Sequence, residues 1–159
     1  MTTTPNFASR GARFVATLVD GAIMGVPCML VMQNAFAQLS LAVLADGTIP
    51  DEQKLTMLLP AIINAYLMIG AVFLAVFVVQ AIFLTRDGQT LGKKALGIRI
   101  VRQDTRKNGG FVTNVLLRTM LNGLLGAVPL YGLLDMVFIF RDDRRCIHDL
   151  IAGTIVVKA

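Results

Sequence analysis

The feature that most constrains this sequence is an apolar run from Leu55 to Leu84, whose part from residue 61 onward contains no charged side chain. A helix needs about 20 apolar residues to cross the hydrocarbon core of a bilayer, and this run exceeds that length. A second run, from Phe14 to about Ala45, is of similar length and contains Pro27. We therefore predict two membrane-spanning helices, over residues of about 13–45 and about 55–84.

The composition indicates a single membrane domain over residues 1–159. The chain is 55% hydrophobic and 16% charged, which is too apolar for an ordinary soluble domain. The first apolar run is too long for the hydrophobic part of a signal peptide, so we expect the first helix to be retained. The predicted fold class is all-α integral membrane, with two full transmembrane helices, a third apolar helix or re-entrant helical hairpin, and a small two-stranded cytoplasmic cap.

The charged residues are distributed unevenly and predict the orientation of the chain. Eight Lys or Arg residues lie in residues 85–118, whereas the loop 46–54 carries three acids and one base. By the positive-inside rule, the basic segment 85–111 and the N-terminus, with Arg10 and Arg13, face the cytoplasm and the acidic loop faces outward. This topology explains the net charge of +5 without nucleic acid as a partner.

The third apolar run, residues 112–140, has two interpretations. As a single span it would place the basic residues of the predicted cytoplasmic tail, 141–159, on the outer side, against the charge rule. A break at Gly126–Pro129 instead allows a re-entrant helical hairpin, whose two short arms enter the membrane and return. Non-helical backbone at that depth has to be buried in protein or line water.

An internal repeat favours the hairpin. Residues 95–102 and 151–158 each contain the apolar end of a short helix, a glycine, and a strand that ends on a basic residue. Strands this short are not stable alone, so we expect them to pair as a two-stranded cytoplasmic cap, with Ile100 beside Val156. This pairing requires an even number of membrane crossings between the strands. We also expect a short helix over Thr90–Leu96.

Charged residues within and beside the apolar runs form a candidate polar centre. Arg13 and Asp20 are seven residues apart, so they share one face of a helix. A carboxylate inside the membrane costs on the order of 3 kcal/mol and should face protein or water. One hypothesis places Asp20 opposite Asp135, where mutual repulsion would suit a proton or cation site. The other is a structural latch, in which Arg13 or Arg118 pairs with one of these two aspartates.

The remaining polar residues have simpler interpretations. Lys93 and Lys94 are expected on a basic amphipathic helix that contacts anionic lipid head groups. His148 and Asp149 are adjacent, but they lack the three or four ligands that a zinc site needs, so we expect no metal and no cofactor. Asp149 is expected to cap the last short helix or to pair with a basic residue. Cys146 has no base at catalytic spacing, so we do not expect an enzyme.

Several of these features occur together in an order that resembles the RDD family of small bacterial integral membrane proteins. They are the Arg13 to Asp20 spacing, the segment QTLGKKALGIRIV at 89–101, Arg118, Asp135, and the segment IHDLIAGTIVV at 147–157. The arginine and two aspartates for which the family is named correspond to Arg13, Asp20 and Asp149. The literal Arg-Asp-Asp at residues 141–143 is unrelated.

The resemblance implies a multi-pass protein of the bacterial inner (plasma) membrane and brings no established catalytic residue. Transport, including cation/proton antiport, is proposed for some members. We therefore expect a transport-related protein that moves a cation or proton through the polar centre. The alternative is a non-transporting interaction or scaffold module with a structural Arg/Asp latch. The expected partners are the lipid bilayer and either further copies of the chain or another membrane protein, because one chain supplies too few helices for a pore.

Overall fold

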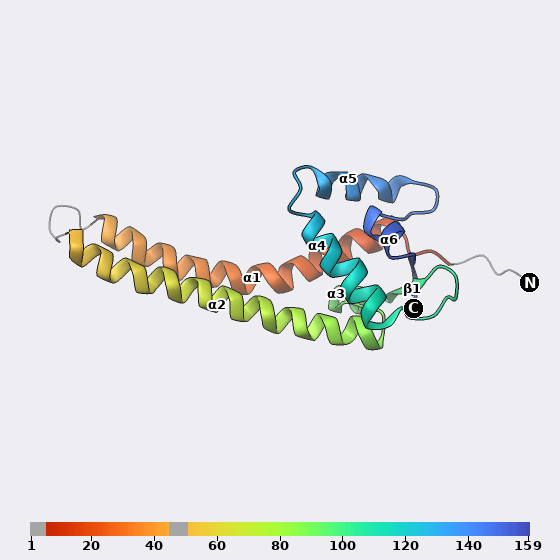
Figure 1. Ribbon diagram of the computed structural model, residues 1–159, viewed down its shortest axis with the longest axis horizontal. Coiled ribbons are helices and arrows are strands. Elements are labelled where there is room, and N and C mark those ends of the chain that lie inside the picture. Colours follow the sequence, from red (N-terminus) through yellow and green to blue (C-terminus); the bar gives the residue numbers. More distant parts are fainter. Residues whose placement is uncertain (1–5, 45–50) are drawn as a thin grey trace, which may run out of the picture. The chain divides into compact units, whose positions relative to one another are not determined.

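The computed structural model describes residues 6–44 and 51–159. The chain divides into two compact units. The sheet unit combines the residues up to Asp20 with Val78–Ala159, and the helix-pair unit is Gly21–Phe77. The elements, seen in Figure 1, are α1 (Arg10–Leu44), α2 (Asp51–Arg86), α3 (Leu91–Ala95), β1 (Ile98–Arg102), η1 (Phe111–Met120), α4 (Leu121–Leu125), α5 (Tyr131–Val137), η2 (Phe138–Phe140), α6 (Ile147–Ile151) and β2 (Thr154–Lys158).

Both predicted long helices are present, with wider bounds than predicted. α1 begins at Arg10 rather than at residue 13, and α2 covers Asp51–Arg86 rather than 55–84. The assignment of residues 51–54 to the acidic loop is wrong, because they form the first turn of α2. An acidic residue such as Glu52 is favourable near the positive end of a helix dipole, which explains the earlier start. The rest of that loop lies outside the described residues.

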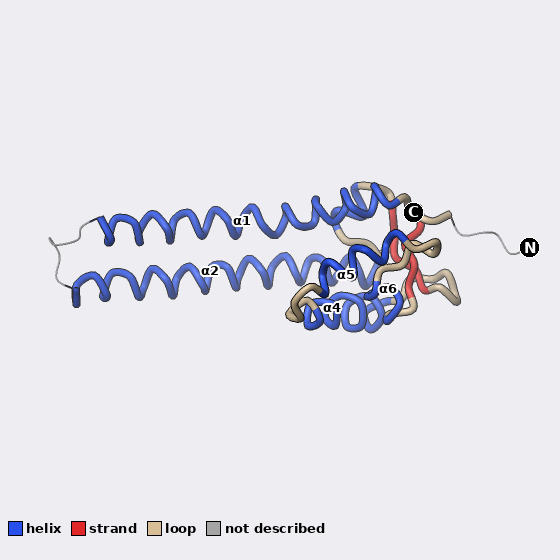
Figure 2. The backbone as a smooth tube through the Cα atoms, turned by 90° about the horizontal axis from the view of Figure 1, so that it is seen from above, coloured by secondary structure: helices blue, strands red, loops and turns tan. Residues whose placement is uncertain are grey.

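In the helix-pair unit, α1 and α2 run side by side, as Figure 2 shows. Their apolar side chains are turned outward: Phe36, Tyr66 and Leu67 are 68%, 75% and 65% exposed. Contiguous exposed apolar surface marks contact with a membrane or a protein partner. Both helices are also long and apolar enough to cross a membrane. These observations agree with the two predicted spans.

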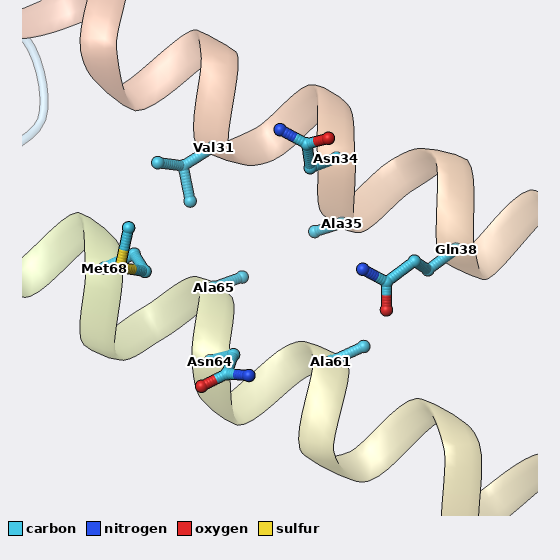
Figure 3. A pocket seen from close by; sticks show the side chains of 8 residues that line it. All are labelled: Val31, Asn34, Ala35, Gln38, Ala61, Asn64, Ala65 and Met68. Carbon is cyan, nitrogen blue, oxygen red and sulfur yellow. The ribbon is translucent and has the colours of Figure 1, made fainter.

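A groove between α1 and α2 in the helix-pair unit is lined by small side chains and by polar amide side chains (Figure 3). Ala35 of α1 lies across from Ala61 and Ala65 of α2, and the amide of Gln38 points toward α2. Small residues allow close approach of helices, and amide side chains form hydrogen bonds between helices in membranes. The groove has a volume of about 150 Å³ and is lined by Val31, Asn34, Ala35, Gln38, Ala61, Asn64, Ala65 and Met68.

The sheet unit is built on the predicted pair of strands. β1 and β2 are antiparallel, and their register places Ile100 opposite Val156, which confirms the predicted neighbours. The side chains of these two residues are 0% and 1% exposed, so they form part of the core. The N-terminal segment extends the pairing, because Phe7 forms a bridge with Val157. This contact is not among the predictions made from the sequence.

The backbone at two glycines explains the internal repeat. Gly97 and Gly153 have φ angles of +60° and +63°, a left-handed conformation that glycine adopts without steric cost. Gly97 lies between α3 and β1, and Gly153 lies between α6 and β2. The repeat therefore encodes the same helix, glycine and strand arrangement twice, and the two copies meet in the sheet.

The third apolar run forms two helical arms, η1 with α4 and α5 with η2, separated by a break around Pro129. In one continuous helix Arg118 and Asp135 would be about 25 Å apart. Instead, both contact the imidazole ring of His148, so the second arm returns toward the first. Residues 112–140 therefore fold as two arms and not as one continuous helix, and the entry of these arms into the membrane stays a prediction. Proline has no backbone N–H and restricts the residue before it, which explains the break.

Candidate functional site

Three of the predicted polar residues, Arg13, Arg118 and Asp149, meet in a buried cluster that we call the arginine latch. The carboxylate of Asp149, on α6, is completely buried. Arg118 Nε on η1 donates to Asp149 Oδ1 at 2.8 Å, and Arg13 Nη1 on α1 lies 3.3 Å from Asp149 Oδ2. Thr154 Oγ1 on β2 also donates to Asp149 Oδ1, at 3.2 Å. One carboxylate therefore joins four elements of the sheet unit.

The surroundings of Asp149 keep it ionised in spite of its burial. Burial opposes the charged form, but the positive charges of Arg118 and Arg13 hold the pKa of Asp149 well below its ordinary value. Arg13 is held in place by backbone as well, because Nη2 donates to Val156 O at 3.3 Å. A carboxylate that stays charged in this way suits a structural role better than proton exchange.

His148 extends the latch to the returning arm of the hairpin. Its Nε2 lies 3.1 Å from Arg118 Nη2, and its Nδ1 lies 2.7 Å from Asp135 Oδ2. A guanidinium group can only donate, so Nε2 accepts and the Nδ1 proton is directed at Asp135. Asp135 Oδ1 also accepts from the backbone N–H of His148 at 3.0 Å. The imidazole ring therefore connects α5 to the latch.

Asp20 forms a second polar site, at the start of α3. Its Oδ1 accepts from the backbone N–H of Gly92 at 2.7 Å and from Gln80 Nε2 at 3.1 Å. Its Oδ2 accepts from the hydroxyl of Thr90, which is the N-cap residue of α3. Asp20 thus joins α1, α2 and the N-terminal end of α3, whose backbone N–H groups need acceptors.

Lys93 belongs to this second site and does not contact lipid as predicted. Its side chain is only 12% exposed and Nζ lies 3.9 Å from Asp20 Oδ2. The prediction is wrong because α3 packs with its Lys93 face inward, toward Asp20. Lys94 is exposed, pairs with Asp87 at 3.2 Å and lies over the ring of Phe83. Its contact with lipid head groups stays a prediction.

The polar centre differs from both sequence hypotheses in its partners. The pairing of Arg13 or Arg118 with Asp20 or Asp135 is wrong, because both arginines bind Asp149. Asp20 and Asp135 do not form the expected facing pair: one binds α3 and the other binds α6. The expected pairing of Asp149 with a basic residue is confirmed. The spacing of residues along a helix indicates how deep a side chain lies, but it does not indicate which side chain of another element it contacts.

Three contributors to these sites were missed: Gln80, Thr90 and His148. Thr90 is the first residue of the predicted short helix, and a threonine at the start of a helix is a capping signal. Gln80 is a polar residue within the long uncharged run, which also marks a functional or packing constraint. His148 was considered only as a metal ligand beside Asp149, and no sequence signal connects it to Asp135.

One further group of side chains has the composition of a metal site. Asp135, Cys146 and His148 each offer one ligand atom, and these atoms lie within 4.8 Å of one another. Burial and the nearby charge of Asp149 raise the pKa of Cys146 to about 12, so the thiol is protonated and is not a nucleophile.

Two curated proteins similar to this chain are named as uncharacterized proteins. The chain is 32% identical over 94 residues to an uncharacterized protein of Haemophilus influenzae and 36% identical over 75 residues to the uncharacterized protein YckC of Bacillus subtilis. These matches cover 57% and 45% of the chain and 57% and 48% of the relatives, so the chain spans about half the length of the curated relatives it matches. No solved structure matches. The model of the RDD family matches residues 7–153, which include the arginine latch and Asp20, and this chain therefore belongs to the RDD family.

Proposed function

We propose that this RDD protein is an integral membrane protein with a transport-related role, in which Lys93 and Asp20 form a proton-handling pair. The observation that carries the proposal is the weak bonding of a buried ammonium group. Lys93 Nζ lies 3.4 Å from Thr90 Oγ1 and 3.9 Å from Asp20 Oδ2, both longer than a good hydrogen bond. An ammonium group with three donors and only such contacts gives up its proton more readily than a solvated one.

The electrostatics of the site support Lys93 as the group that exchanges a proton. Burial and then the charge of Arg118 lower the pKa of Lys93 to about 8, despite the opposing charge of Asp20. A fraction of the Lys93 side chains is therefore neutral near physiological pH. Asp149 stays charged between two arginines, so its role is to hold the sheet unit together. The proposal thus assigns exchange to Lys93 with Asp20 and support to the arginine latch.

A non-transporting interaction or scaffold module is the second candidate, and the bonding of Asp20 favours it. Both carboxylate oxygens of Asp20 accept hydrogen bonds, from Gly92, Gln80 and Thr90. A carboxylate satisfied in this way needs no transported ion as a partner. In this candidate function Asp20 only anchors α3, and the latch only fixes the packing of the sheet unit.

Proton flux into proteoliposomes separates the two functions. Purified protein is reconstituted with a trapped pH-sensitive dye, and a pH gradient is imposed with each of several monovalent cations present. We expect flux above that of protein-free liposomes for the wild type and none for Lys93→Met or Asp20→Asn. Lys94→Met is the matched control, because Lys94 is the neighbouring lysine on the exposed face of α3, and it should retain flux.

Wild-type liposomes no more permeable than empty ones would refute transport. Lys93→Met as active as the wild type would refute the role of Lys93 and Asp20 as the proton-handling pair. Thermal unfolding in detergent shows whether each variant is folded. A folded wild type without flux would favour the scaffold function.

We further propose placement in the bacterial inner membrane with a cytoplasmic N-terminus, and assembly with further copies or another membrane protein. The basic residues of 85–118 lie in the same compact unit as Arg10 and Arg13, which supports one cytoplasmic side for all of them. Single cysteines at Asn108 and Ala159 should resist an impermeant reagent added outside. A cysteine at Thr48 should react, and external labelling at Ala159 would contradict the orientation.

A further inference from the structure

We propose that Asp135, Cys146 and His148 form a binding site for a divalent transition metal ion of the zinc class. Their ligand atoms lie within 4.8 Å of one another, although Asp135 is on α5 and the other two residues are at the start of α6. Carboxylate, thiolate and imidazole are the ligand types that zinc prefers. Three protein ligands leave the fourth position of a tetrahedral site for water or another small ligand.

Small side-chain movements are sufficient to form the site. Zinc bonds of about 2.0–2.3 Å in a tetrahedron place neighbouring ligand atoms about 3.3–3.7 Å apart. Asp135 Oδ2 and His148 Nδ1 are now 2.7 Å apart, so they must open by roughly half an ångström. The Cys146 thiol lies within 4.8 Å of both atoms, so it must approach by up to roughly 1 Å. Asp135 Oδ1 can stay on the backbone N–H of His148 while Oδ2 binds the metal. The backbone already holds two of the ligands near their places.

The arginine latch supplies the outer support that a metal-bound histidine needs. A histidine that binds metal through Nδ1 carries its proton on Nε2, and that N–H commonly donates to a carboxylate. Asp149 Oδ1 lies 3.7 Å from His148 Nε2 and can accept this bond. The contact of Arg118 Nη2 with Nε2 would then be lost, but Arg118 keeps its 2.8 Å bond to Asp149 through Nε. One carboxylate, one thiolate and a dication together carry no net charge.

The adjacent His148 and Asp149 alone provide too few ligands, which is why the sequence predicts no metal. In the folded protein Asp149 is paired with the arginines, and the potential ligands that accompany His148 are Asp135 and Cys146. A metal there would tie the returning arm of the hairpin to α6. The inference is independent of the proposed proton-handling pair, because it uses neither Lys93 nor Asp20.

Cobalt is the probe for this site, because a thiolate bound to Co²⁺ produces a charge-transfer absorption band. Full-length protein in detergent, reduced and stripped of metal, is titrated with Co²⁺ and then with Zn²⁺. We expect one Co²⁺ per chain with the thiolate band, displacement by Zn²⁺, and a higher melting temperature with Zn²⁺. Cys146→Ser should abolish the band, and Asp135→Asn should weaken Zn²⁺ binding at least tenfold.

Cys28→Ser is the matched control, because Cys28 is the other cysteine of the chain and lies outside the sheet unit. It should keep the band and the affinity. No thiolate band in the wild type overturns the proposal, as does a band that disappears with Cys28→Ser and survives Cys146→Ser. If Cys146→Ser does not fold, the wild-type band, its persistence in Cys28→Ser and the effect of Asp135→Asn decide.

Discussion

The sheet unit and the helix-pair unit differ in where their characteristic side chains find contacts. In the sheet unit, the buried side chains of Arg13 and Arg118 form ion pairs with Asp149 of the same chain. The helix-pair unit turns large apolar side chains such as Phe36 and Leu67 outward, with 68% and 65% of their surface exposed. The first unit is therefore specified by bonds within the chain, and the second depends on an apolar environment. Substitutions in the two units should differ accordingly in their effect on stability in detergent.

The largest effect is expected from Asp149→Leu in the arginine latch. The substitution leaves Arg13 and Arg118 buried without their carboxylate, and breaking a buried ion pair in this way costs about 3–5 kcal/mol. The free energy of unfolding, measured by thermal or chemical denaturation in detergent, should fall by this amount. The additional substitutions Arg13→Met and Arg118→Met should restore most of the stability, because they remove the unpaired charges.

An exposed ion pair of the same unit provides the control for this prediction. Arg102 Nη2 and Asp104 Oδ2 are 2.9 Å apart, but both side chains are largely exposed. Asp104→Asn should therefore leave the melting temperature nearly unchanged. If Asp149→Leu behaves like Asp104→Asn, the latch does not stabilise the sheet unit.

Lys93 should give the sheet unit an alkaline pH dependence. Its pKa is lowered to about 8 in the folded protein, from an unfolded value of about 10.4, so protonation favours the unfolded state. The free-energy cost of burying the protonated Lys93 side chain is fully present below about pH 8 and disappears as the pH rises to about 10.5. The free energy of unfolding should therefore increase over this interval, by up to about 3 kcal/mol. Lys93→Met should remove this increase and stabilise the protein at neutral pH. Lys94→Met should retain it, and a flat wild-type profile would contradict the buried lysine.

Two glycine substitutions compare the packing of the two units directly. A Cβ added to Gly92 would lie 2.9 Å from Asp20 Cγ and nearer still to the carbonyl oxygen of Ala16, whereas a Cβ added to Gly70 would meet no atom within 4 Å. Gly92→Ala should therefore destabilise the protein by about 1–3 kcal/mol. Gly70→Ala should be neutral or slightly stabilising, because alanine favours the helix. Equal melting temperatures for the two variants would show that α3 does not pack on Asp20.

The smallest effect is expected from Leu67→Ala in the helix-pair unit. Leu67 is 65% exposed, so its truncation should change stability in detergent by less than about 0.5 kcal/mol. Ile100→Ala, in the fully buried core of the sheet, should cost about 2–5 kcal/mol in the same experiment. A cost for Leu67→Ala as large as that for Ile100→Ala would mean that α1 and α2 form a packed core of their own.

The elements that the sequence predicted correctly are those with strong local signals. The two long helices follow from uninterrupted apolar runs, and the strand register follows from a repeat whose two copies both require a left-handed glycine, at Gly97 and Gly153. The break near Pro129 has a local cause as well. In these regions the preferences of neighbouring residues and the tertiary structure point to the same result.

The partners within the polar centre could not be predicted in the same way. Asp149 and Arg13 are 136 residues apart, and nothing in the local sequence indicates which carboxylate an arginine will bind. The hypotheses favoured Asp20 and Asp135 because both lie in apolar runs. The fold instead gives both arginines to Asp149, since α6 brings it next to β2 at the centre of the sheet unit.

The bridge between Phe7 and Val157 has a consequence for the order of events during synthesis. Val157 follows Phe7 by 150 residues, and β2 follows β1 by about 50 residues. At about 5–20 residues per second, Phe7 waits for its partner for roughly 8–30 s after it is made. α1 and α2 are complete well before β2 exists. The helices can therefore reach the membrane first, while both arginines of the latch stay unpaired until α6 and β2 leave the ribosome.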